Sequence, residues 1–244
     1  MLTGKIALVT GGSRGIGAAT AATLARYGAD VAVTFVSSSD KAATTVDAVR
    51  AAGRTGLAVQ ADSARPDDVV RAVDETVSRF GGIDILVNNA GIFPYGPLEE
   101  LTVDEIDHTF AVHVRAALLA SQAAARHMND GGRIVSVGSN LADRVPFPGI
   151  TLYAASKAAL DGMTKGLARD LGPRGITANV VHPGPTDSDM NPADGDGADA
   201  QRELAALGRY GTTEDVAETV AHLAGPGGRS ITGTSVLVDG GSNA

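Results

Sequence analysis

The chain has 244 residues, of which 43% are hydrophobic and 20% charged, a balance typical of a folded globular protein and a length sufficient for one large α/β domain. Its net charge of −8 argues against nonspecific binding to nucleic acid, which requires a basic surface. Without any cysteine, the chain can form no disulfide framework and no thiolate metal site, and it has no cysteine nucleophile.

The first predicted element is a short strand over residues 5–10, a nearly all-apolar run of the kind found in parallel strands that are covered on both faces. The residues before it do not have the layout of a signal peptide. The apolar runs of the chain are also far shorter than the ~20 residues that span a bilayer. We therefore expect a cytoplasmic protein with no membrane partner.

A glycine-rich turn, residues 11–17, joins this strand to an alanine-rich helix that is predicted to run to about Tyr27. Glycines at such a turn let the backbone approach a ligand closely, and the N–H groups at the start of the helix favour a pyrophosphate. A tight turn without a ligand is the alternative, but the order strand, glycines, helix, strand favours a dinucleotide site. The turn residues expected to contact the dinucleotide are Gly11, Ser13, Arg14, Gly15, Ile16 and Gly17.

The second strand, residues 30–35, ends at the place that distinguishes NAD from NADP. An NAD site of this design usually carries an acidic residue there, roughly 18 residues after the last glycine, but this chain has Phe35. No carboxylate is present to repel a 2′-phosphate, the serines that follow, including Ser37, can donate to one, and Arg14 and Lys41 can supply positive charge. We therefore favour NADP(H) over NAD(H). The alternative is a polar loop with no preference.

The first half of the chain alternates strictly between predicted strands and helices, which implies a parallel sheet with right-handed crossover connections. The third strand is followed by Asp62, and the fourth ends in the segment Asn88-Asn89-Ala90-Gly91. Both lie at the carboxyl edge, where ligands bind in open α/β sheets. Beyond this segment, Phe93 and Tyr95 are expected either to line an apolar pocket or to anchor a buried loop. The remaining elements of this half are helices over 40–52 and 66–80 and strands over 56–61 and 83–87.

The second half opens with residues 103–128, which predict one long helix that carries His108, His113 and His127. The spacing of these histidines matches no metal motif, so we predict no metal site and expect surface or packing roles for His108 and His127. A fifth strand brings Ser139 to its carboxyl end. The other predicted elements of this half are strands over 132–138, 176–182 and 235–239 and helices over 151–171 and 213–224.

The segment 151–160 contains the pair of residues on which the predicted chemistry depends. It is alanine-rich and free of glycine and proline, which predicts a helix. In a helix, residues i and i+4 share one face, so the phenol of Tyr153 and the ammonium of Lys157 point the same way. A cation beside a phenol favours the phenolate and lowers the phenol pKa toward the range useful for acid/base transfer. A half-exposed tyrosine next to a solvated lysine is the alternative for this pair taken alone.

An acidic stretch with two glycines follows the sixth strand. Residues 187–200 hold five aspartates, and a segment of this composition is not expected to pack on its own. We therefore predict a mobile substrate lid over about 187–207, with a solvated loop as the alternative. Met190 in this stretch, and Phe147 before the Tyr153 helix, are expected to join the two aromatic residues after the fourth strand in a moderately apolar substrate pocket.

Taken together, these residues resemble the classical short-chain dehydrogenase/reductase family across essentially the whole chain. Each motif alone is modest, but their order and spacing are very specific. The matching motifs are Thr10-Gly11-(x3)-Gly15-(x)-Gly17, Asn88-Asn89-Ala90-Gly91, Ser139, Tyr153-(x3)-Lys157, Pro183-Gly184 and Asp239-Gly240-Gly241. The resemblance implies a single Rossmann-type, doubly wound domain over residues 1–244 with a seven-stranded parallel sheet, and commonly a homotetramer.

The resemblance also implies a role for each matching residue. Tyr153 is the acid/base, Lys157 lowers its pKa and binds the nicotinamide ribose, and Ser139 hydrogen-bonds the substrate carbonyl or alcohol. The implied reaction is the NADPH-dependent interconversion of a ketone and a secondary alcohol, with a small molecule as substrate. The further implied cofactor contacts are Asp62 near the adenine, Asn89 and Gly91 beside the adenosine ribose, Thr186 near the nicotinamide amide, and Ala90, Pro183 and Gly184.

Two positions depart from the family pattern. Where the family has its fourth catalytic residue, an asparagine in the long helix, this chain has His113. The asparagine supports a water chain to the lysine, and histidine also binds water, so we expect turnover with an altered proton relay. Ser188 stands where a threonine usually follows the Pro-Gly motif, and it keeps the hydroxyl.

Two other functions remain open. Relatives that reduce 3-oxoacyl chains on acyl carrier protein tend to have a basic cluster just before the fifth strand, but this chain has His127-Met128-Asn129-Asp130 there, and its acidic surface would repel an acidic carrier protein. The second is a non-catalytic, nucleotide-binding regulator, because residues 138–146 and 191–193 resemble relatives described as cyclic-dinucleotide-binding biofilm dispersal proteins. The intact Ser-Tyr-Lys set favours chemistry.

Overall fold

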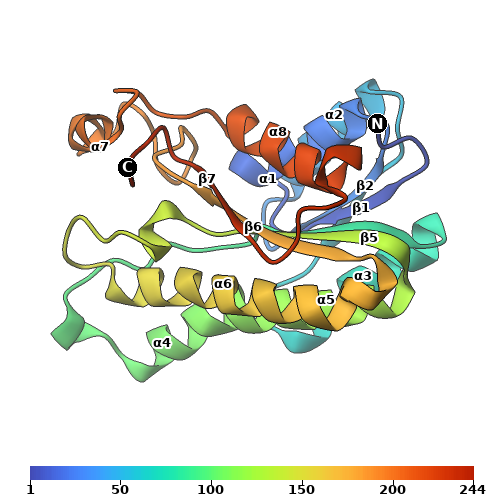
Figure 1. Ribbon diagram of the computed structural model, residues 1–244, viewed down its shortest axis with the longest axis horizontal. Helices are drawn as coiled ribbons and strands as arrows, with labels where there is room; N and C mark the ends of the chain where they lie inside the picture. Colours follow the sequence, from blue (N-terminus) through green and yellow to red (C-terminus); the bar gives the residue numbers. More distant parts are fainter.

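Seven parallel strands form one sheet in the order β3-β2-β1-β4-β5-β6-β7 in the computed structural model, which describes all residues from Met1 to Ala244 (Figure 1). The strand order reverses between β1 and β4, which is the doubly wound arrangement. The predicted α/β class with seven parallel strands is therefore confirmed. The strands are β1 (Ile6–Val9), β2 (Asp30–Phe35), β3 (Gly56–Gln60), β4 (Ile83–Asn88), β5 (Met128–Val137), β6 (Thr177–Pro183) and β7 (Ser235–Val238).

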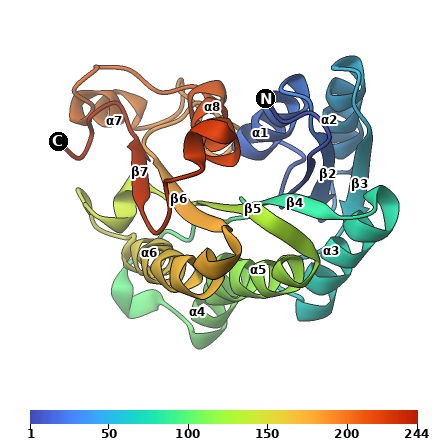
Figure 2. The ribbon, with the colours of Figure 1, turned by 45° about the vertical axis from the view of Figure 1, so that its right-hand side comes forward.

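Helices cover both faces of the sheet, with α1, α2 and α8 on one face and α3, α5 and α6 on the other (Figure 2). Each face has its own core, which is why the central strand β1 is apolar along its whole length: Ala7 and Val9 belong to one cluster and Leu8 to the other. None of the helices is both long and apolar enough to cross a membrane. They are α1 (Gly15–Arg26), α2 (Ser39–Ala51), α3 (Pro66–Phe80), α4 (Val103–Phe110), α5 (Ala116–His127), α6 (Thr151–Leu171), α7 (Ala198–Leu204) and α8 (Thr213–Ala224).

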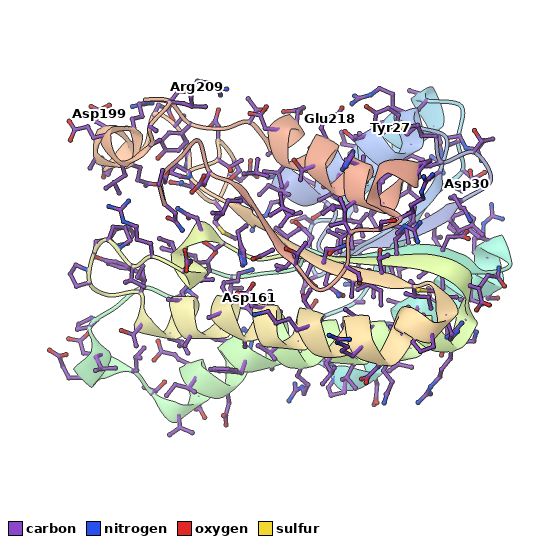
Figure 3. The ribbon with its side chains drawn as sticks, in the orientation of Figure 1. Tyr27, Asp30, Asp161, Asp199, Arg209 and Glu218 are labelled. Atoms are coloured by element: carbon purple, nitrogen blue, oxygen red, sulfur yellow. The ribbon has the colours of Figure 1, made fainter.

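The first and the last long helix are joined at their surface, far along the chain from each other. Tyr27 Oη at the end of α1 donates to Glu218 Oε2 of α8 at 2.6 Å, and Arg26 pairs with the same carboxylate at 2.5 Å (Figure 3). This contact closes the layer of helices that covers β1 and β2. The carboxyl ends of the central strands lie at one edge of the sheet. The glycine turn after β1 therefore lies at the same edge as Asn88, Ser139 and Pro183, which stand at or just after the ends of β4, β5 and β6.

The helix predicted over 103–128 is interrupted. α4 is followed by a π-helical turn over Ala111–Arg115, after which α5 continues to His127. The π turn contains the buried side chains of Ala111, Val112 and His113. Single π turns of this kind often occur at functional sites. No glycine or proline marks the interruption, so the hydrophobic pattern alone predicts one continuous helix.

Strand β5 begins at Met128, four residues before the predicted start at Gly132. Met128 pairs with Ile83, and the register then shifts so that Arg133 pairs with Ile85. The irregularity lies between Met128 and Arg133 of β5, a stretch that includes Gly132, the predicted start of the strand. The strand is therefore longer than predicted because pairing continues across a bulge.

The segment predicted to be a lid has more structure than its composition suggests. It contains α7, and the side chains of Asn191 and Gln201 exchange hydrogen bonds of 2.9 and 3.2 Å. Asp187 Oδ1 also accepts from the backbone N–H of Ala193 at 2.9 Å. The expectation that this acidic stretch does not pack on its own is therefore wrong, because its polar side chains satisfy one another locally.

Candidate active site

A cleft of about 860 Å³ follows the carboxyl edge of the sheet. Its walls contain all the residues predicted to contact cofactor or substrate other than Lys41, and every predicted catalytic residue except His113. The predicted residues that line it are Gly11, Ser13, Arg14, Gly15, Ile16, Gly17, Ser37, Asp62, Asn89, Ala90, Gly91, Phe93, Tyr95, Ser139, Phe147, Tyr153, Lys157, Pro183, Gly184, Thr186 and Met190.

Asn89 ties the glycine turn to the end of β4. Its Nδ2 donates to the carbonyl oxygens of Thr10 at 2.9 Å and Gly11 at 3.1 Å, and Thr10 Oγ1 accepts from the backbone N–H groups of Asn89 and Ala90. A Cβ atom at Gly17 would lie 2.5 Å from Asn89 Nδ2, so glycine is required there. The amide of Asn89 therefore supports the turn.

The N-terminus of α1 has no cap of its own. Arg14 at the N-cap position makes no side-chain capping hydrogen bond, and the first turn of the helix carries no acidic residue. The backbone is also open at Gly15, which has φ +53° and whose Cβ position meets only Ser188 Cβ, at 3.7 Å. Uncapped N–H groups and the positive end of the helix dipole suit an anion, and a pyrophosphate fits this opening.

Two cations and one carboxylate meet at the mouth of the cleft. Lys41 Nζ lies 2.5 Å from Asp189 Oδ2, and Arg14 Nη1 lies 3.9 Å from the same oxygen. The hydrogen bond and charge of Lys41, with a smaller effect of Arg14, lower the pKa of Asp189. The two cations predicted to face a 2′-phosphate therefore lie together, and the carboxylate that pairs with them, Asp189, belongs to the predicted lid.

Helix α6 carries Tyr153 and Lys157 into the cleft wall, and both side chains are buried. Lys157 Nζ lies over the Tyr153 ring, 5.8 Å from its centroid, and donates to the carbonyl oxygen of Val137 at 3.0 Å. This burial excludes the half-exposed, solvated alternative for the pair. Burial also lowers the pKa of Lys157 to about 8.

The pKa of Tyr153 differs in direction from the sequence-based expectation. Burial raises it, and a hydrogen bond with Ser139 lowers it by less. The predicted direction of the shift is therefore wrong for this structure, even though a nearby cation favours the phenolate. The physical reason is that the ammonium of Lys157 is directed to the carbonyl of Val137, whereas the phenol is almost fully removed from water.

Ser139 follows β5 and is held from two sides. Its Oγ accepts from the backbone N–H of Leu141 at 3.2 Å, and its own backbone N–H donates to Nδ1 of His182 at 2.9 Å. The residue is buried, with its hydroxyl toward the Tyr153 phenol. The hydroxyl and the phenol therefore face one position in the cleft.

His113 lies behind the cleft wall. Its Nε2 accepts from the backbone N–H of Ile92 at 2.9 Å, so the ring proton is on Nδ1, which donates to Ser156 Oγ at 2.8 Å. Ser156 Oγ in turn donates to the carbonyl of Tyr153 at 2.7 Å. Burial, followed by the charge of Lys157, lowers the pKa of His113 to about 3. The neutral ring thus connects the loop after β4 to the backbone of α6.

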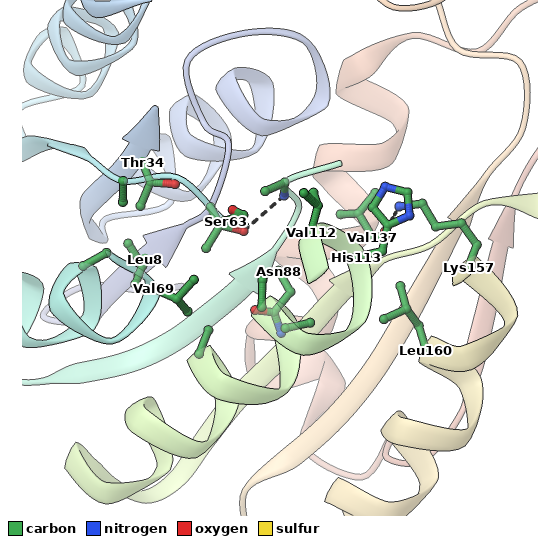
Figure 4. Close-up of a pocket in the computed structure, with 17 residues that line it drawn as sticks. Leu8, Thr34, Ser63, Val69, Asn88, Val112, His113, Val137, Lys157 and Leu160 are labelled. Carbon is green, nitrogen blue, oxygen red and sulfur yellow. Dashed lines mark hydrogen bonds between the residues drawn. The ribbon is translucent and has the colours of Figure 1, made fainter. Parts of the chain in front are cut away.

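A small cavity of about 20 Å³ adjoins His113 and Lys157 and extends toward Asn88 (Figure 4). A cavity of this size holds about one water molecule. The other two histidines of this region lie elsewhere. His108 is exposed at the cleft, and His127 faces Asp74 on the surface at 3.6 Å.

The aromatic residues after β4 line the cleft. Phe93 packs edge-on against Tyr153, with ring centroids 4.8 Å apart, and stacks on Tyr95 at 6.4 Å. Phe93, Tyr95 and Met190 all retain large exposed fractions. Phe93 and Tyr95 therefore line the cleft and do not anchor a buried loop.

Sequence reasoning missed two supports of the Ser139 region. His182 Nε2 lies 3.0 Å from Asp161 Oδ1, and Asn243 near the C-terminus exchanges hydrogen bonds with Asn140, beside Ser139. The helical spacing contains a signal for Asp161, because it follows Lys157 by four residues on the same face of α6. No local pattern in the sequence points to Asn243.

Comparisons with known proteins agree with this geometry. Residues 11–243 match a family model described as enoyl-(acyl carrier protein) reductase. The cyclic-di-GMP-binding biofilm dispersal mediator protein of Escherichia coli (strain K12) is 48% identical over 98% of this chain and 97% of its own length.

Two solved structures are also similar over the whole chain. A short chain dehydrogenase from Burkholderia cenocepacia J2315 in complex with NADP is 62% identical, with a TM-score of 0.98, and the match covers 100% of this chain and 99% of that one. A blue fluorescent protein from a metagenomic library in complex with NADPH is 56% identical, with a TM-score of 0.97 and the same coverage. With matches of this extent, the chain belongs to the short-chain dehydrogenase/reductase family of oxidoreductases.

Proposed function

We propose that this protein is an NADPH-dependent reductase that interconverts a ketone and a secondary alcohol. One observation carries the proposal: Ser139, Tyr153 and Lys157 share the cleft onto which the glycine turn opens. The NADP and NADPH in the two similar solved structures support the choice of cofactor. The end of β2 supports it as well, because Phe35 stands where an NAD site usually has a carboxylate.

The residues present fit such a cofactor. The uncapped N-terminus of α1 would hold the pyrophosphate, and Arg14, Ser37 and Lys41 would contact the 2′-phosphate. Asp62 would lie near the adenine, and Lys157 would bind the nicotinamide ribose. When bound, NADPH supplies the hydride for the reduction.

The side chains of the cleft orient the ketone and supply the proton. Ser139 Oγ–H donates to the ketone oxygen and fixes its direction. The phenol of Tyr153, which burial keeps protonated at neutral pH, gives its proton to that oxygen as negative charge develops there. The ammonium of Lys157 then stabilises the phenolate. Phe93 packs edge-on against the phenol ring.

The buried phenol predicts opposite pH dependences for the two directions of the reaction. Because burial raises the pKa of Tyr153 above its ordinary value of 10.0, the proton donor for reduction persists through neutral pH. Alcohol oxidation needs the phenolate, so its rate is expected to rise with pH up to the alkaline range. Initial rates in both directions from pH 6 to pH 10 measure this. Two identical profiles would contradict the assignment of Tyr153 as the titrating group.

The first test of the proposed function is NADPH oxidation, followed by nicotinamide absorbance, with a panel of β-keto esters, aryl ketones, diketones and quinones. NADH is measured in parallel. Turnover with NADPH well above that with NADH supports the reductase, and the best ketone outlines the apolar pocket of Phe93, Tyr95, Phe147 and Met190. If no compound is turned over while NADPH still binds, the proposed reaction is wrong.

Lys41→Ala is expected to weaken NADPH binding about 10-fold, the equivalent of one charged hydrogen bond, and to leave NADH binding within about twofold. The reason is that only NADPH carries the 2′-phosphate that Lys41 would contact. Asp189→Asn should strengthen NADPH binding, because it removes a carboxylate that competes for the same cation at 2.5 Å. Fluorescence titrations with both cofactors measure the difference, and Lys165→Ala on the exposed face of α6 is the control. An equal loss for both cofactors would contradict the assignment.

We further propose that residues 187–207 act as a lid over the substrate. Met190, Gln201 and Leu204 of this segment line the cleft, which supports the assignment. Asp189 joins the same segment to Lys41 beside the proposed 2′-phosphate site. A lid in this place would contact both the substrate pocket, through Met190, and the proposed 2′-phosphate site, through Asp189.

A non-catalytic nucleotide-binding regulator is the second candidate, because the E. coli relative is a cyclic-di-GMP-binding biofilm dispersal mediator. Calorimetric titration with cyclic-di-GMP and with NADPH separates the two functions. Tight cyclic-di-GMP binding with no ketone turnover favours the regulator. An acyl-carrier-protein substrate is less favoured than a small ketone, since the start of β5 carries the exposed Asp130 rather than a basic cluster.

A further inference from the structure

We propose that His182 and Asp161 form a pair that positions Ser139. They are positioning residues, because neither is assigned a contact with substrate or cofactor and both act through the backbone of Ser139. The inference rests on the proposed function, in which the Ser139 hydroxyl orients the ketone.

The pair connects three elements behind the cleft. His182 lies near the end of β6 and is 3% exposed, and its Nδ1 accepts from the backbone N–H of Ser139 at 2.9 Å. Its Nε2 lies 3.0 Å from Oδ1 of Asp161. Figure 3 labels Asp161 on α6. A buried N–H group without an acceptor destabilises the folded protein. The backbone N–H of Ser139 lies just beyond the end of β5, where strand pairing stops, and the His182 ring supplies its acceptor.

The hydrogen bonds define the tautomer of the ring. The backbone N–H of Ser139 can only donate, so Nδ1 of His182 carries no proton. The single proton of the neutral ring is then on Nε2 and is donated to the carboxylate of Asp161. Asp161 therefore holds His182 in the one tautomer that can accept from Ser139, as carboxylates behind functional histidines do.

Close packing against the backbone also restricts the position of the His182 ring. A Cβ atom at Gly138 would lie 2.3 Å from Nδ1 and 2.5 Å from Cε1 of His182, so the ring packs directly on the backbone before Ser139. Leu141 N–H holds the Ser139 hydroxyl from the other side at 3.2 Å. The path of the backbone into Ser139, and hence the place of its hydroxyl, is set by the position of this ring.

Helix α6 connects the pair to the rest of the active site. Tyr153, Lys157 and Asp161 follow one another at intervals of four residues, so they lie along one face of the helix. The phenol and the ammonium of this face line the cleft, and the carboxylate reaches Ser139 through His182. One helix face thus sets the position of the proton donor relative to the hydroxyl that orients the ketone.

The test compares His182→Ala, which removes the acceptor, with His182→Asn, whose Oδ1 can take the place of Nδ1. His182→Ala is expected to lower kcat for ketone reduction about 10- to 100-fold, as a displaced catalytic group does, with NADPH affinity within about twofold. His182→Asn should recover most of this loss. Asp161→Leu should lower kcat similarly, and adding it to His182→Ala should cause little further loss, because the two residues act as one unit. His127→Ala, at an exposed histidine, is the control.

Wild-type kcat in His182→Ala would overturn the inference. Equal losses in the Ala and Asn variants together with weaker NADPH binding would overturn it as well, because this pattern indicates general structural damage. Long-range proton–nitrogen NMR of the wild-type protein gives a second measurement that does not depend on activity. It should report an unprotonated Nδ1 at His182, which Asp161→Leu disturbs. If the wild-type protein reduces no ketone but this tautomer is observed, the proposed function fails and the His182–Asp161–Ser139 connection stands; a protonated Nδ1 would refute the connection itself.

Discussion

Tyr153→Phe is expected to lower the rate of ketone reduction by about 10²–10⁴-fold, the range that general acid catalysis contributes. The substitution removes one oxygen atom, which is the proton donor of the proposed mechanism, and keeps the ring that packs against Phe93 with centroids 4.8 Å apart. The shape of the cleft is therefore preserved, and NADPH affinity should stay within about twofold. Turnover measured by absorbance and NADPH affinity measured by fluorescence test both parts.

Tyr27→Phe is the matched control for this substitution. It also removes a hydrogen-bonded phenol, which donates to Glu218 at 2.6 Å, but Tyr27 lies outside the cleft. Its turnover should equal that of the wild-type protein. A Tyr153→Phe protein that reduced ketones at the wild-type rate would show that another group donates the proton, and a parallel loss of NADPH binding would show that the phenol serves the cofactor instead.

Most of the fold could be predicted from the sequence because its signals are local. Apolar runs predict the seven strands, and alanine-rich or amphipathic segments between them predict the crossover helices. The errors occur where long-range contacts override the local pattern. The π turn at Ala111–Arg115 buries His113 against the loop after β4, and β5 starts early because Met128 finds a partner in Ile83.

The residues of the cleft were predictable for a different reason. In a parallel sheet the strand ends meet at one edge, so motifs after β1, β4, β5 and β6 had to come together. The electrostatics of the site were not predictable in the same way. The pKa of Tyr153 depends on how deeply it is buried, and the role of His113 depends on the Ile92 and Ser156 contacts, none of which appears in the spacing of residues.

Lys157→Met is expected to lower ketone reduction by about 10²–10³-fold and to make the protein more stable at neutral pH. The activity falls because no cation remains to stabilise the phenolate of Tyr153. The stability rises because burial lowers the pKa of Lys157 from 10.5 to about 8, so the folded protein holds a buried cation at pH 7. That shift corresponds to about 3 kcal/mol, and losing the hydrogen bond to Val137 offsets about 1 kcal/mol of it.

The sign of the pH dependence follows from which state binds more protons. Between pH 8 and 10.5 the unfolded chain keeps Lys157 protonated while the folded protein releases the proton, so wild-type stability gains from this residue as the pH rises. The advantage of Lys157→Met should therefore be full below pH 8 and be lost before pH 10.5, where the missing hydrogen bond to Val137 leaves the variant about 1 kcal/mol less stable than the wild type. Urea unfolding of both proteins at pH 7 and pH 10 measures it, with Lys165→Met on the exposed face of α6 as the control.

A Lys157→Met protein that was less stable than the wild type at both pH values would mean that the ammonium is well solvated in the folded protein. In that case its effect on the phenolate would be weak as well, because charges interact strongly only where water is excluded. The two measured quantities are thus connected: the burial that makes Lys157 unfavourable for folding is what makes it effective next to Tyr153. Loss of activity without a gain in stability would separate them and would assign Lys157 to cofactor binding alone.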